Sequence, residues 1–572
     1  MSTAKSLFPT FLCLFEGMAT DSISTPMLQI SDLSVSFRRN GVWSEVIRSV
    51  SLTVMRGRVL AIVGESGSGK TVSSLACMGL LPAEISRVNH GNIVFDRTID
   101  LLQNASEGAK SVRGKRITMI FQEPMSSLNP SMRVGDQIAE AIRQTRDLSA
   151  TELTQEVVRR MAEVELPQPD SMRKRYPHEL SGGQKQRVMI AMALAVDPDL
   201  IIADEPTTAL DVTVQKSILS LLHRLQRERQ LAMIFISHDL ELVSEIADDL
   251  AVMYKGDVVE SGRARDVLAQ PNHPYTRALL ACKPPVDGTR RHLLTLTDVL
   301  GDTHPPDRVY PKNTCKKVVL EATNLRKSFV TRRSIFGRPS AYFEAVKDVS
   351  FQLFEGETLG IVGESGCGKS TVSRMIMGLS PLDGGTLRWY PQTAEPRPIV
   401  QLVFQDPYAS LNPRITAVNC LIEALVHSKQ AAHTAEARSM ALALMHEVGL
   451  PAEFADRYPH AFSGGQRQRL VIARALCANP KVLILDESVA ALDISVQAQV
   501  LNLLNQLKVE RQLTFVFISH DLRVVAYMSD RVMVMYRGLI EEIGTPNDIF
   551  YSPTRDYTKK LVASIVGVSM IG

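Results

Sequence analysis

Two short glycine-rich stretches have the residue types and the spacing that can hold a triphosphate. They read GESGSGKT over residues 64–71 and GESGCGKS over residues 363–370, each directly after an apolar, strand-like run. In this pattern glycines let backbone N–H groups point at phosphate oxygens, the lysine reaches the outer phosphates and the last hydroxyl faces Mg2+. Two such matches in one chain predict two binding sites for a nucleoside triphosphate with Mg2+. The residues expected to bind nucleotide in and beside these loops are Gly64, Ser66, Gly67, Gly69, Lys70, Thr71, Gly363, Ser365, Gly366, Gly368, Lys369, Ser370 and Thr371.

Two apolar runs further along the chain each end in a pair of acids, Asp204-Glu205 and Asp486-Glu487. The first acid of each pair can hold Mg2+, directly or through water. The second acid, Glu205 or Glu487, can polarise the attacking water, an assistance worth roughly 10²–10⁴ in rate. Because each pair follows a phosphate loop, the sequence predicts hydrolysis of the bound triphosphate.

The sequence contains an internal repeat of one long unit. Ser181 recurs as Ser463 and Glu205 recurs as Glu487, in both cases 282 positions later. Differences in length between the copies fall upstream of these landmarks, where surface loops tolerate insertions. A repeat of this length indicates two homologous halves.

Each half has the pattern of an α/β domain. A strand-rich start leads through the phosphate loop into helical periodicity, as in 134–143 and 153–164, and then into alternating strands and helices over 200–236. That alternation predicts a parallel sheet flanked by helices, with the middle helices as a separate lobe. We expect a disordered extension over 1–26, a first domain over 27–283, a proline-containing linker over 284–316 and a second domain over 317–572.

The bulk composition excludes several classes of protein. A length of 572 residues fits about four compact units, here two lobes in each half. A net charge of +3 without a long basic block gives no reason to expect nucleic acid as a partner. No apolar run reaches the 18 residues that span a bilayer, so a membrane role would need partner proteins. Seven scattered cysteines without a C-x-x-C pair indicate a reduced, cytosolic chain without a structural metal site.

Two Ser-Gly-Gly-Gln turns precede basic, helix-forming runs and offer N–H groups and a hydroxyl to an anion. They comprise Ser181, Gly182, Gly183 and Gln184 in the first half and Ser463, Gly464, Gly465 and Gln466 in the second. With these turns the sequence resembles the ATP-binding cassette family of ATPases over nearly its whole length. The resemblance implies two tandem P-loop nucleotide-binding domains, each a RecA-like parallel-sheet core with a strand-rich subdomain and an inserted helical lobe. It also implies head-to-tail pairing of the halves, with Ser463 closing over the nucleotide at Lys70 and Ser181 over the nucleotide at Lys369.

The other family landmarks follow in order. Gln122 and Gln405 match the glutamine loop, which touches magnesium and the partner membrane subunit. His238 and His520 match the histidine that contacts the γ-phosphate, although a lone histidine after a strand is more often structural. The resemblance therefore gives Glu205, Glu487, His238 and His520 as catalytic candidates. It gives Thr71, Gln122, Asp204, Ser370, Gln405 and Asp486 as the Mg2+ site residues.

Two further pairs of residues match less specific family positions. Asp211 and Asp493 match the loop that contacts the opposite half. Phe37 and Phe329 match the aromatic side chain that stacks on adenine, and a plain core role is an equal alternative for each.

The two halves differ directly after the acid pairs. The first reads Thr207-Thr208 after Pro206, whereas the equivalent residues of the second half are Val489-Ala490. Both sites are expected to hydrolyse nucleotide, but this difference gives reason to doubt that they do so at equal rates. Cys367 lies inside the second phosphate loop, so a thiol reagent is expected to hamper that site, with ATP protecting it.

The motif Ser-Leu-Asn-Pro at 127–130 and 410–413, and the tail His-Pro-Tyr-Thr-Arg-Ala-Leu-Leu at 273–280, resemble the oligopeptide, dipeptide and nickel importer branch. This resemblance implies a fused double ATPase that energises peptide uptake. Its expected partners are two permease subunits and an extracytoplasmic solute-binding protein, at the cytoplasmic face of the plasma membrane. Nickel, glutathione and sugar import are alternatives, as is a tandem cassette acting on ribosomes. The linker here lacks the long charged helix of the ribosomal class.

Overall fold

The computed structural model describes residues 25–39, 41–103, 108–123, 127–208, 210–285, 290–301, 308–333, 339–390, 399–490 and 492–563. Nearly all of the expected N-terminal extension, residues 1–24, lies outside these ranges. Among the described helices, none has the length and apolar character needed to cross a membrane.

The first half is built around a six-stranded sheet of order β10-β9-β3-β8-β7-β6. Its strands are β3 (Val59–Val63), β6 (Ile117–Ile120), β7 (Leu200–Asp204), β8 (Ala232–Ser237), β9 (Asp249–Tyr254) and β10 (Asp257–Arg263). The pairs from β9 to β6 are parallel, and β10 joins β9 antiparallel. Every residue of β3 is buried, which explains its unbroken apolar sequence, because helices cover both faces of a parallel sheet.

A second sheet of order β2-β1-β4-β5 forms the strand-rich subdomain of the first half. It contains β1 (Pro26–Arg39), β2 (Val42–Met55), β4 (Ser86–Phe95) and β5 (Ile99–Asp100). In β2, Val50, Leu52 and Val54 are buried and alternate with exposed residues. This alternation of period two places one face on the core and the other in solvent.

The helices of the first half divide between the sheet and a separate lobe. The lobe contains α4 (Val134–Arg143), α5 (Ala150–Glu163) and α6 (Pro169–Met172), before η1 (Pro177–Glu179). The remaining helices are α1 (Lys70–Cys77), α2 (Gly108–Val112), α7 (Gly182–Leu194), α8 (Val212–Arg229), α9 (Leu240–Ile246), α10 (Ala264–Ala269) and α11 (Pro274–Ala281). Helix α5 begins three residues before the predicted 153, because Ser149 and Glu152 form a capping box at its start.

The second half repeats this architecture in a sheet of order β14-β11-β12-β19-β18-β13-β17-β16-β15. A single parallel pair, Asp348 with Leu539, joins its strand-rich part to its core. The strands are β11 (Val318–Arg333), β12 (Pro339–Phe354), β13 (Thr358–Val362), β14 (Gly384–Trp389), β15 (Val400–Val403), β16 (Val482–Asp486), β17 (Thr514–Ile518), β18 (Arg531–Tyr536) and β19 (Leu539–Gly544).

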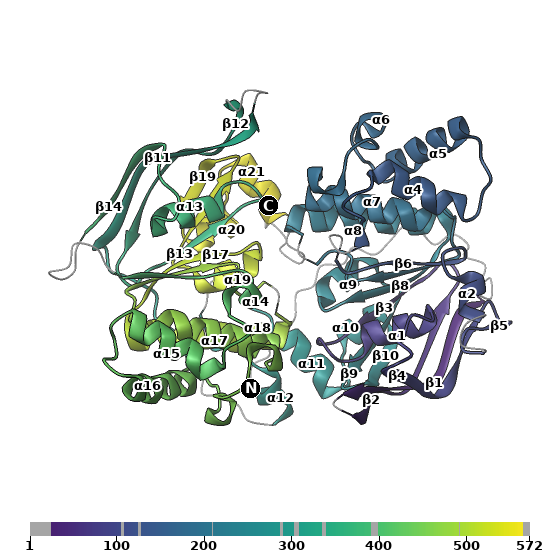
Figure 1. The fold of residues 1–572 in the computed structure, drawn as a ribbon, viewed down its shortest axis with the longest axis horizontal. Helices are drawn as coiled ribbons and strands as arrows, with labels where there is room; N and C mark the ends of the chain where they lie inside the picture. Colours follow the sequence, from purple (N-terminus) through teal and green to yellow (C-terminus); the bar gives the residue numbers. More distant parts are fainter. Residues whose placement is uncertain are drawn as a thin grey trace, which may run out of the picture.

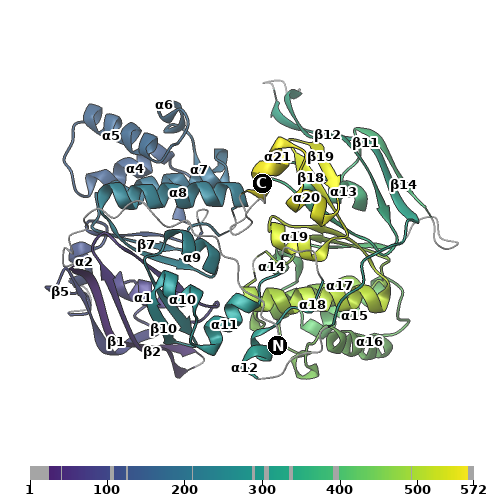
Figure 2. The same cartoon turned by 180° about the vertical axis from the view of Figure 1, so that it is seen from behind.

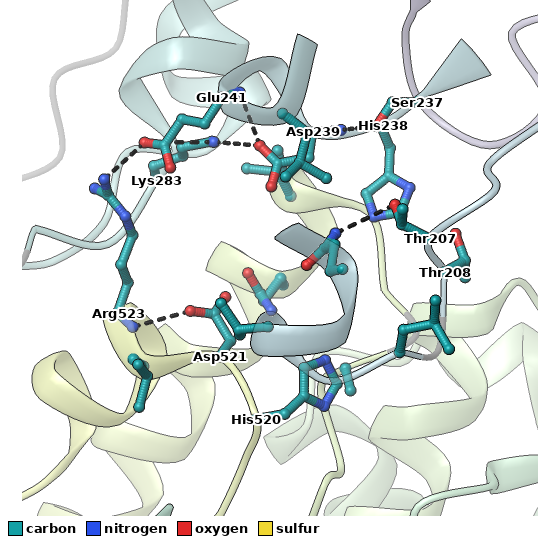
Figure 3. Close-up of a pocket in the computed structure, with 18 of the residues that line it drawn as sticks. Thr207, Thr208, Ser237, His238, Asp239, Glu241, Lys283, His520, Asp521 and Arg523 are labelled. Atoms are coloured by element: carbon teal, nitrogen blue, oxygen red, sulfur yellow. Dashed lines mark hydrogen bonds and ion pairs between the residues drawn. The ribbon is translucent and has the colours of Figure 1, made fainter. Parts of the chain in front are cut away.

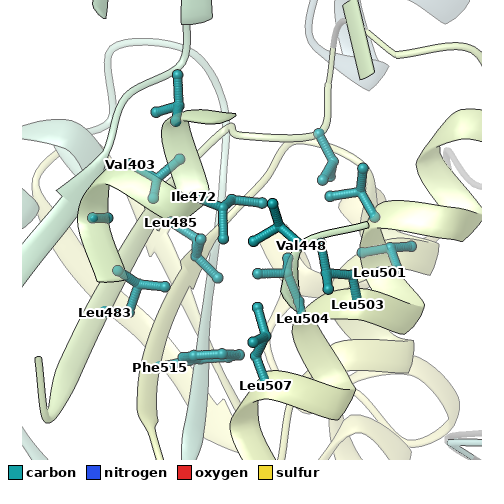
Figure 4. Packing of buried hydrophobic residues seen from close by; sticks show 14 of the residues in the cluster. Val403, Val448, Ile472, Leu483, Leu485, Leu501, Leu503, Leu504, Leu507 and Phe515 are labelled. Carbon is teal, nitrogen blue, oxygen red and sulfur yellow. The ribbon is translucent and has the colours of Figure 1, made fainter. Parts of the chain in front are cut away.

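The helices of the second half again divide between its sheet and a lobe, which contains α15 (Ala417–His427) and α16 (Thr434–Glu447). The remaining helices are α13 (Lys369–Met377), α14 (Pro407–Ser410), η2 (Ala452–Phe454), η3 (Pro459–Ala461), α17 (Gly464–Leu476), α18 (Ile494–Arg511), α19 (Leu522–Met528), α20 (Pro546–Tyr551) and α21 (Asp556–Val562). Leu483, Leu485 and Phe515 of the sheet pack against Ile472 of α17 and Leu504 of α18 (Figure 4). The predicted fold, two α/β cassettes with parallel-sheet cores, is confirmed.

The two halves lie side by side in opposite orientations. The helical lobe with α4 and α5 is at the top of the first half in Figure 1, whereas α15 and α16 are at the bottom of the second. The view from behind gives the same arrangement (Figure 2). This orientation places α21, at the end of the second half, beside α8 of the first half, where Lys216 donates to the carbonyl oxygen of Ala563 (Figure 1).

The described part of the segment between the halves packs on the second half. The guanidinium of Arg290, itself 3% exposed, lies 2.9 Å from Asp530. The backbone N–H of Leu293 donates to Asn502 at 2.9 Å, and α12 (Leu296–Leu300) follows. On the other side, Lys283 bonds to Asp239 of the first half at 2.6 Å.

Candidate functional site: two phosphate loops at a shared seam

The first phosphate loop joins β3 to α1. Gly64 has φ +154°, and a Cβ at this position would collide with the carbonyl oxygen of Met253, so only glycine fits. The ammonium of Lys70 is 5% exposed and donates to the carbonyl oxygens of Gly64 at 2.7 Å and Glu65 at 2.9 Å. Burial lowers the pKa of Lys70, against the opposing charges of Glu205 and Asp493. The loop therefore encloses one cation at the start of a helix, which favours an anion.

The second loop has the same geometry between β13 and α13. A Cβ at Gly363 would meet the carbonyl oxygen of Met535, and Lys369 donates to Gly363 at 2.8 Å and Glu364 at 2.9 Å. Cys367 is buried, with its Sγ 3.9 Å from the Lys369 ammonium. Burial raises the pKa of Cys367 despite that neighbouring charge.

A hydroxyl and a carboxylate meet beside each loop. Thr71 donates to Asp204 at 3.3 Å, and Ser370 donates to Asp486 at 3.2 Å. Burial raises the pKa of Asp204 to about 6 and raises the pKa of Asp486 in the same direction. A divalent cation would favour the ionised form of both, and this pair of oxygen ligands fits Mg2+, which keeps water in its other positions.

Glu205 lies at the centre of a polar cluster in the first half. It accepts hydrogen bonds from Gln122 at 3.0 Å and Thr208 at 2.9 Å, and Nδ1 of His238 lies 3.3 Å from its carboxylate. Burial alone would raise the pKa of Glu205, but its hydrogen bond and charge interaction with His238 outweigh burial and lower it. The same contacts raise the pKa of His238 against the effect of its burial.

Glu487 has a similar but smaller cluster in the second half. Gln405 donates to it at 2.7 Å, and Nδ1 of His520 lies 3.6 Å away. The hydrogen bond from His520 lowers the pKa of Glu487 although burial opposes it. Ala490 stands where the first half has Thr208 and has no hydroxyl to donate. Both glutamates have positive φ, 45° for Glu205 and 49° for Glu487, a sparsely populated conformation typical of functional sites.

The two Ser-Gly-Gly-Gln turns each begin a long helix. Ser181 caps α7 and Ser463 caps α17, in capping boxes with Gln184 and Gln466. Each serine thus fixes the start of its helix and leaves N–H groups of the first turn at the helix end. The reach of these turns to the opposite nucleotide stays a prediction.

Residues from opposite halves meet at the phosphate loops. Asp493 accepts a hydrogen bond from the backbone N–H of Ser66 at 2.9 Å, and Ser495 bonds to the carboxylate of Glu65. At the other loop the hydroxyl of Thr213 lies 3.5 Å from Glu364. The sequence pointed to Asp493 as a contact between halves, but it did not single out the roles of these two glutamates and hydroxyls. The signal was present in the recurrence of Glu65 as Glu364 and of a hydroxyl two residues after each aspartate.

The two aromatic candidates differ in their surroundings. Phe37 is partly buried and packs against the apolar core of its subdomain. Phe329 is 42% exposed on β11, with the ammonium of Lys327 5.8 Å from its ring centroid. Exposure leaves Phe329 able to stack on a base, whereas the core role fits Phe37 better.

A cavity of about 170 Å³ lies on the seam between the halves (Figure 3). Both histidines, His238 and His520, line it together with residues that follow them. Glu241 and Arg523, from opposite halves, form an ion pair in its lining. The two sites are therefore neighbours across one shared space.

Comparison with known proteins gives a consistent family. Residues 47–208 and 346–490 match the family described as ABC transporter. Residues 259–315 match a region described as oligopeptide/dipeptide transporter, C-terminal region. The chain is similar to the glutathione import ATP-binding protein GsiA of Pectobacterium atrosepticum, with 44% identity over 94% of this chain and 89% of that protein. The GsiA protein of Salmonella typhimurium is 43% identical over 95% of this chain and 90% of its own length.

Among solved structures, the chain is similar to the archaeal ribosome recycling factor aABCE1 in its complex with the ribosomal stalk protein aP1. The TM-score is 0.57 with 21% identity, and the likeness covers 89% of each chain. At that identity the similarity shows the shared fold of a tandem cassette and nothing of function. Together with the family matches, the geometry of the two loops leads to one conclusion: the chain belongs to the ATP-binding cassette family of transporter ATPases, as a fused double ATPase of the importer branch related to peptide transporters.

Proposed function

We propose that this ATPase energises the uptake of short peptides, of the dipeptide and oligopeptide class, with glutathione as the specific alternative. The likeness of residues 259–315 to the oligopeptide/dipeptide transporter C-terminal region supports the cargo. The meeting of each phosphate loop with the segment after the acid pair of the opposite half supports the coupling to ATP. Asp493 at Ser66 and Thr213 near Glu364 make these contacts. We assign the two ATPase domains to residues 27–283 and 317–572, joined by 284–316.

Each site is proposed to be composite. Lys70 binds the outer phosphates of one ATP and Ser463 closes over that ATP from the other half, while Lys369 and Ser181 do the same for the second ATP. Contacts from two halves on one nucleotide make ATP binding favour the closed seam, because the ligand stabilises only the state that offers both sets of contacts.

Glu205 and Glu487 are the proposed general bases. The lowered pKa of each keeps it ionised at neutral pH, ready to accept a proton from the attacking water. His238 and His520 hold these carboxylates in place and are proposed to reach the γ-phosphate. Mg2+, held by Asp204 with Thr71 and by Asp486 with Ser370, would neutralise phosphate charge when bound; Gln122 and Gln405 would complete its surroundings.

Closure of the seam is proposed to drive two permease subunits docked beside the glutamine loops. The proposed docking surfaces are residues 125–137 and 408–418, of which 125 and 126 lie outside the described residues. Tyr408 is 55% exposed at the second of these surfaces. Since Gln122 and Gln405 contact the proposed general bases, movement at a docking surface and chemistry at the site would be linked.

Uptake in membrane vesicles tests the cargo and the coupling together. Vesicles from cells that carry the chain are compared with vesicles that carry the Lys70→Ala/Lys369→Ala variant, using labelled dipeptide, glutathione and nickel. We expect the variant to lose ATP-dependent uptake of a peptide, because both phosphate loops lack their cation. Equal uptake of dipeptide and glutathione in both preparations would overturn the proposal, and loss of nickel uptake alone would correct the cargo.

Affinity purification tests the partners. We expect the tagged chain to retain two proteins with several membrane spans from the membrane fraction. Retention of ribosomal proteins in their place would favour the alternative of a cassette acting on ribosomes.

A further inference from the structure

Helices α9 and α19 are equivalent elements of the two halves that meet at the seam. Asp239 caps α9 by accepting the backbone N–H of Glu241, and Asp521 caps α19 by accepting the backbone N–H of Arg523. Each helix directly follows the histidine predicted to reach the γ-phosphate. The orientation of these two short helices is therefore coupled to both sites.

One ion pair crosses the seam between these helices. The guanidinium of Arg523 lies 2.9 Å from the carboxylate of Glu241, and the side chains are only 20% and 27% exposed (Figure 3). An opposite charge at this distance, partly withdrawn from water, attracts more strongly than an exposed pair. The two residues are also equivalent, because both stand two positions after the capping aspartate and are 282 positions apart.

Because the two residues occupy equivalent positions in the two halves, this ion pair can distinguish a seam between unlike halves from a seam between like halves. In a two-fold arrangement of identical units, a residue near the axis meets its own copy. Two first halves would therefore bring Glu241 against Glu241, and two second halves would bring Arg523 against Arg523. Like charges in close contact carry a large penalty, which suppresses wrong partners.

The neighbouring charges leave the α9 side of the seam acidic. Lys283, which belongs to the first half, lies 3.6 Å from Glu241 and 2.6 Å from Asp239. It offsets part of the acidic charge on its own half, but two carboxylates against one ammonium leave the first half acidic here. In the second half the carboxylate of Asp521, two residues before Arg523, offsets part of the positive charge of Arg523. The equivalent position in the second half is Ile565, so the second half has no matching ammonium in its sequence.

We propose that the ion pair between Glu241 and Arg523 selects the partner at the nucleotide seam. It stabilises a seam between a first half and a second half, and like-charge repulsion disfavours a seam between two like halves. The partner that fits the α9 face is thus the second half, on the same chain or on another copy. This inference concerns the choice of partner and does not depend on the transported cargo.

Charge reversal in the full-length chain tests the contact. Glu241→Arg places two guanidinium groups at the seam and Arg523→Glu places two carboxylates there, whereas the double exchange restores opposite charges. We expect the rate of amide hydrogen exchange in 240–246 and 522–528 to rise about tenfold in each single variant. In the double variant Glu241→Arg/Arg523→Glu it should return to within about twofold of wild type. Hydrogen exchange reports seam packing even if the chain hydrolyses no ATP, so failure here is distinct from failure of the proposed function.

Glu84→Arg is the matched control, because it makes the same change of charge at an exposed position of the first half that is not among the residues lining the seam cavity. We expect exchange within about twofold of wild type for this variant. The proposal would be overturned if the double variant were no better protected from hydrogen exchange than the worse single variant. It would also be overturned if the single variants exchanged like the control.

Mixing the single variants tests partner choice. A first half from Glu241→Arg complements a second half from Arg523→Glu, and these two halves are on different chains. We expect a two-chain species in the equimolar mixture by analytical ultracentrifugation, and little of it for either variant alone. A mixture that stays entirely as single chains would overturn the role of the pair in choosing a partner.

Discussion

The two nucleotide sites have the same motifs at equivalent positions, yet different numbers of groups hold the proposed general base. Glu205 is held by Gln122, Thr208 and His238, while Glu487 is held by Gln405 and His520. The missing contact comes from one substitution outside the shared motif, Thr208 to Ala490. Two sites with one chemistry can therefore differ in how firmly the reacting group is positioned, which affects rate without removing activity.

The seam contacts differ in the same direction. Asp493 reaches across to the first loop, whereas its equivalent, Asp211, accepts the N–H of Val214 at 2.9 Å and caps its own helix α8. The first loop thus has two side-chain contacts from the opposite half, through Asp493 and Ser495. The comparison predicts that the first site is the better organised of the two.

The largest expected effect comes from removing the general bases. Glu205→Gln together with Glu487→Gln should lower steady-state ATP turnover of the full chain at least roughly 100-fold, because neither site can accept the proton. Among the single variants, Glu487→Gln should keep more turnover than Glu205→Gln, since it leaves the better organised site. The reverse order would contradict the prediction that the first site is the better organised.

Replacing the seam aspartates Asp493 and Asp211 should have smaller effects than replacing the general bases. Asp493→Ala removes a charged acceptor from the Ser66 N–H, so we expect the ATP concentration for half-maximal turnover to rise about tenfold. Asp211→Ala should instead cost about 1 kcal/mol of stability through loss of a helix cap, with a change of less than about twofold in that concentration. ATP titrations and thermal unfolding of both variants separate the two roles, and equal titrations would contradict the asymmetry.

The hydroxyl of Thr208 should have a smaller effect. Thr208 is one of three groups that hold the ionised carboxylate of Glu205, so we expect loss of its hydrogen bond to cost about 1 kcal/mol, or roughly fivefold in rate. Thr208→Ala in the Glu487→Gln background should lower turnover by that factor, because only the first site reports there. Ala490→Thr in the Glu205→Gln background is the reciprocal change and should raise turnover if the hydroxyl reaches Glu487. No change in either background would mean that Thr208 does not position the carboxylate.

The smallest effect is expected at Cys367. Cys367→Ser copies Ser68 of the first loop and should keep turnover within about twofold. The raised pKa of the buried Cys367 thiol means that little thiolate forms at neutral pH, so alkylation should be slow and should accelerate as the pH rises. Mass spectrometry of the modified peptide measures the rate, and bound ATP should lower it. Rapid alkylation at neutral pH would show that the loop opens more than its burial implies.

Much of this site could be predicted from the sequence because its motifs act locally. Gly67 has φ +79° with no atom near the position of its Cβ, so its own backbone conformation selects glycine, and helix α4 has the bounds that its periodicity predicted, 134–143. Contacts such as Ser495 with Glu65, or Arg523 with Glu241, join residues that are far apart in sequence. No local pattern encodes which residues meet across a seam, because the relative placement of the halves decides it. The linker shows the same limit, since proline content predicted a connection but not its packing on the second half.

The anchored linker sets how far the halves can separate. Lys283 is tied to the first half and Arg290 is buried in the second, so only residues 284–289 connect the two anchors. Fully extended, the seven peptide steps from 283 to 290 span at most about 25 Å. While both anchors hold, Lys283 and Arg290 cannot move further apart than that span. The halves therefore stay at high effective concentration for the next closure.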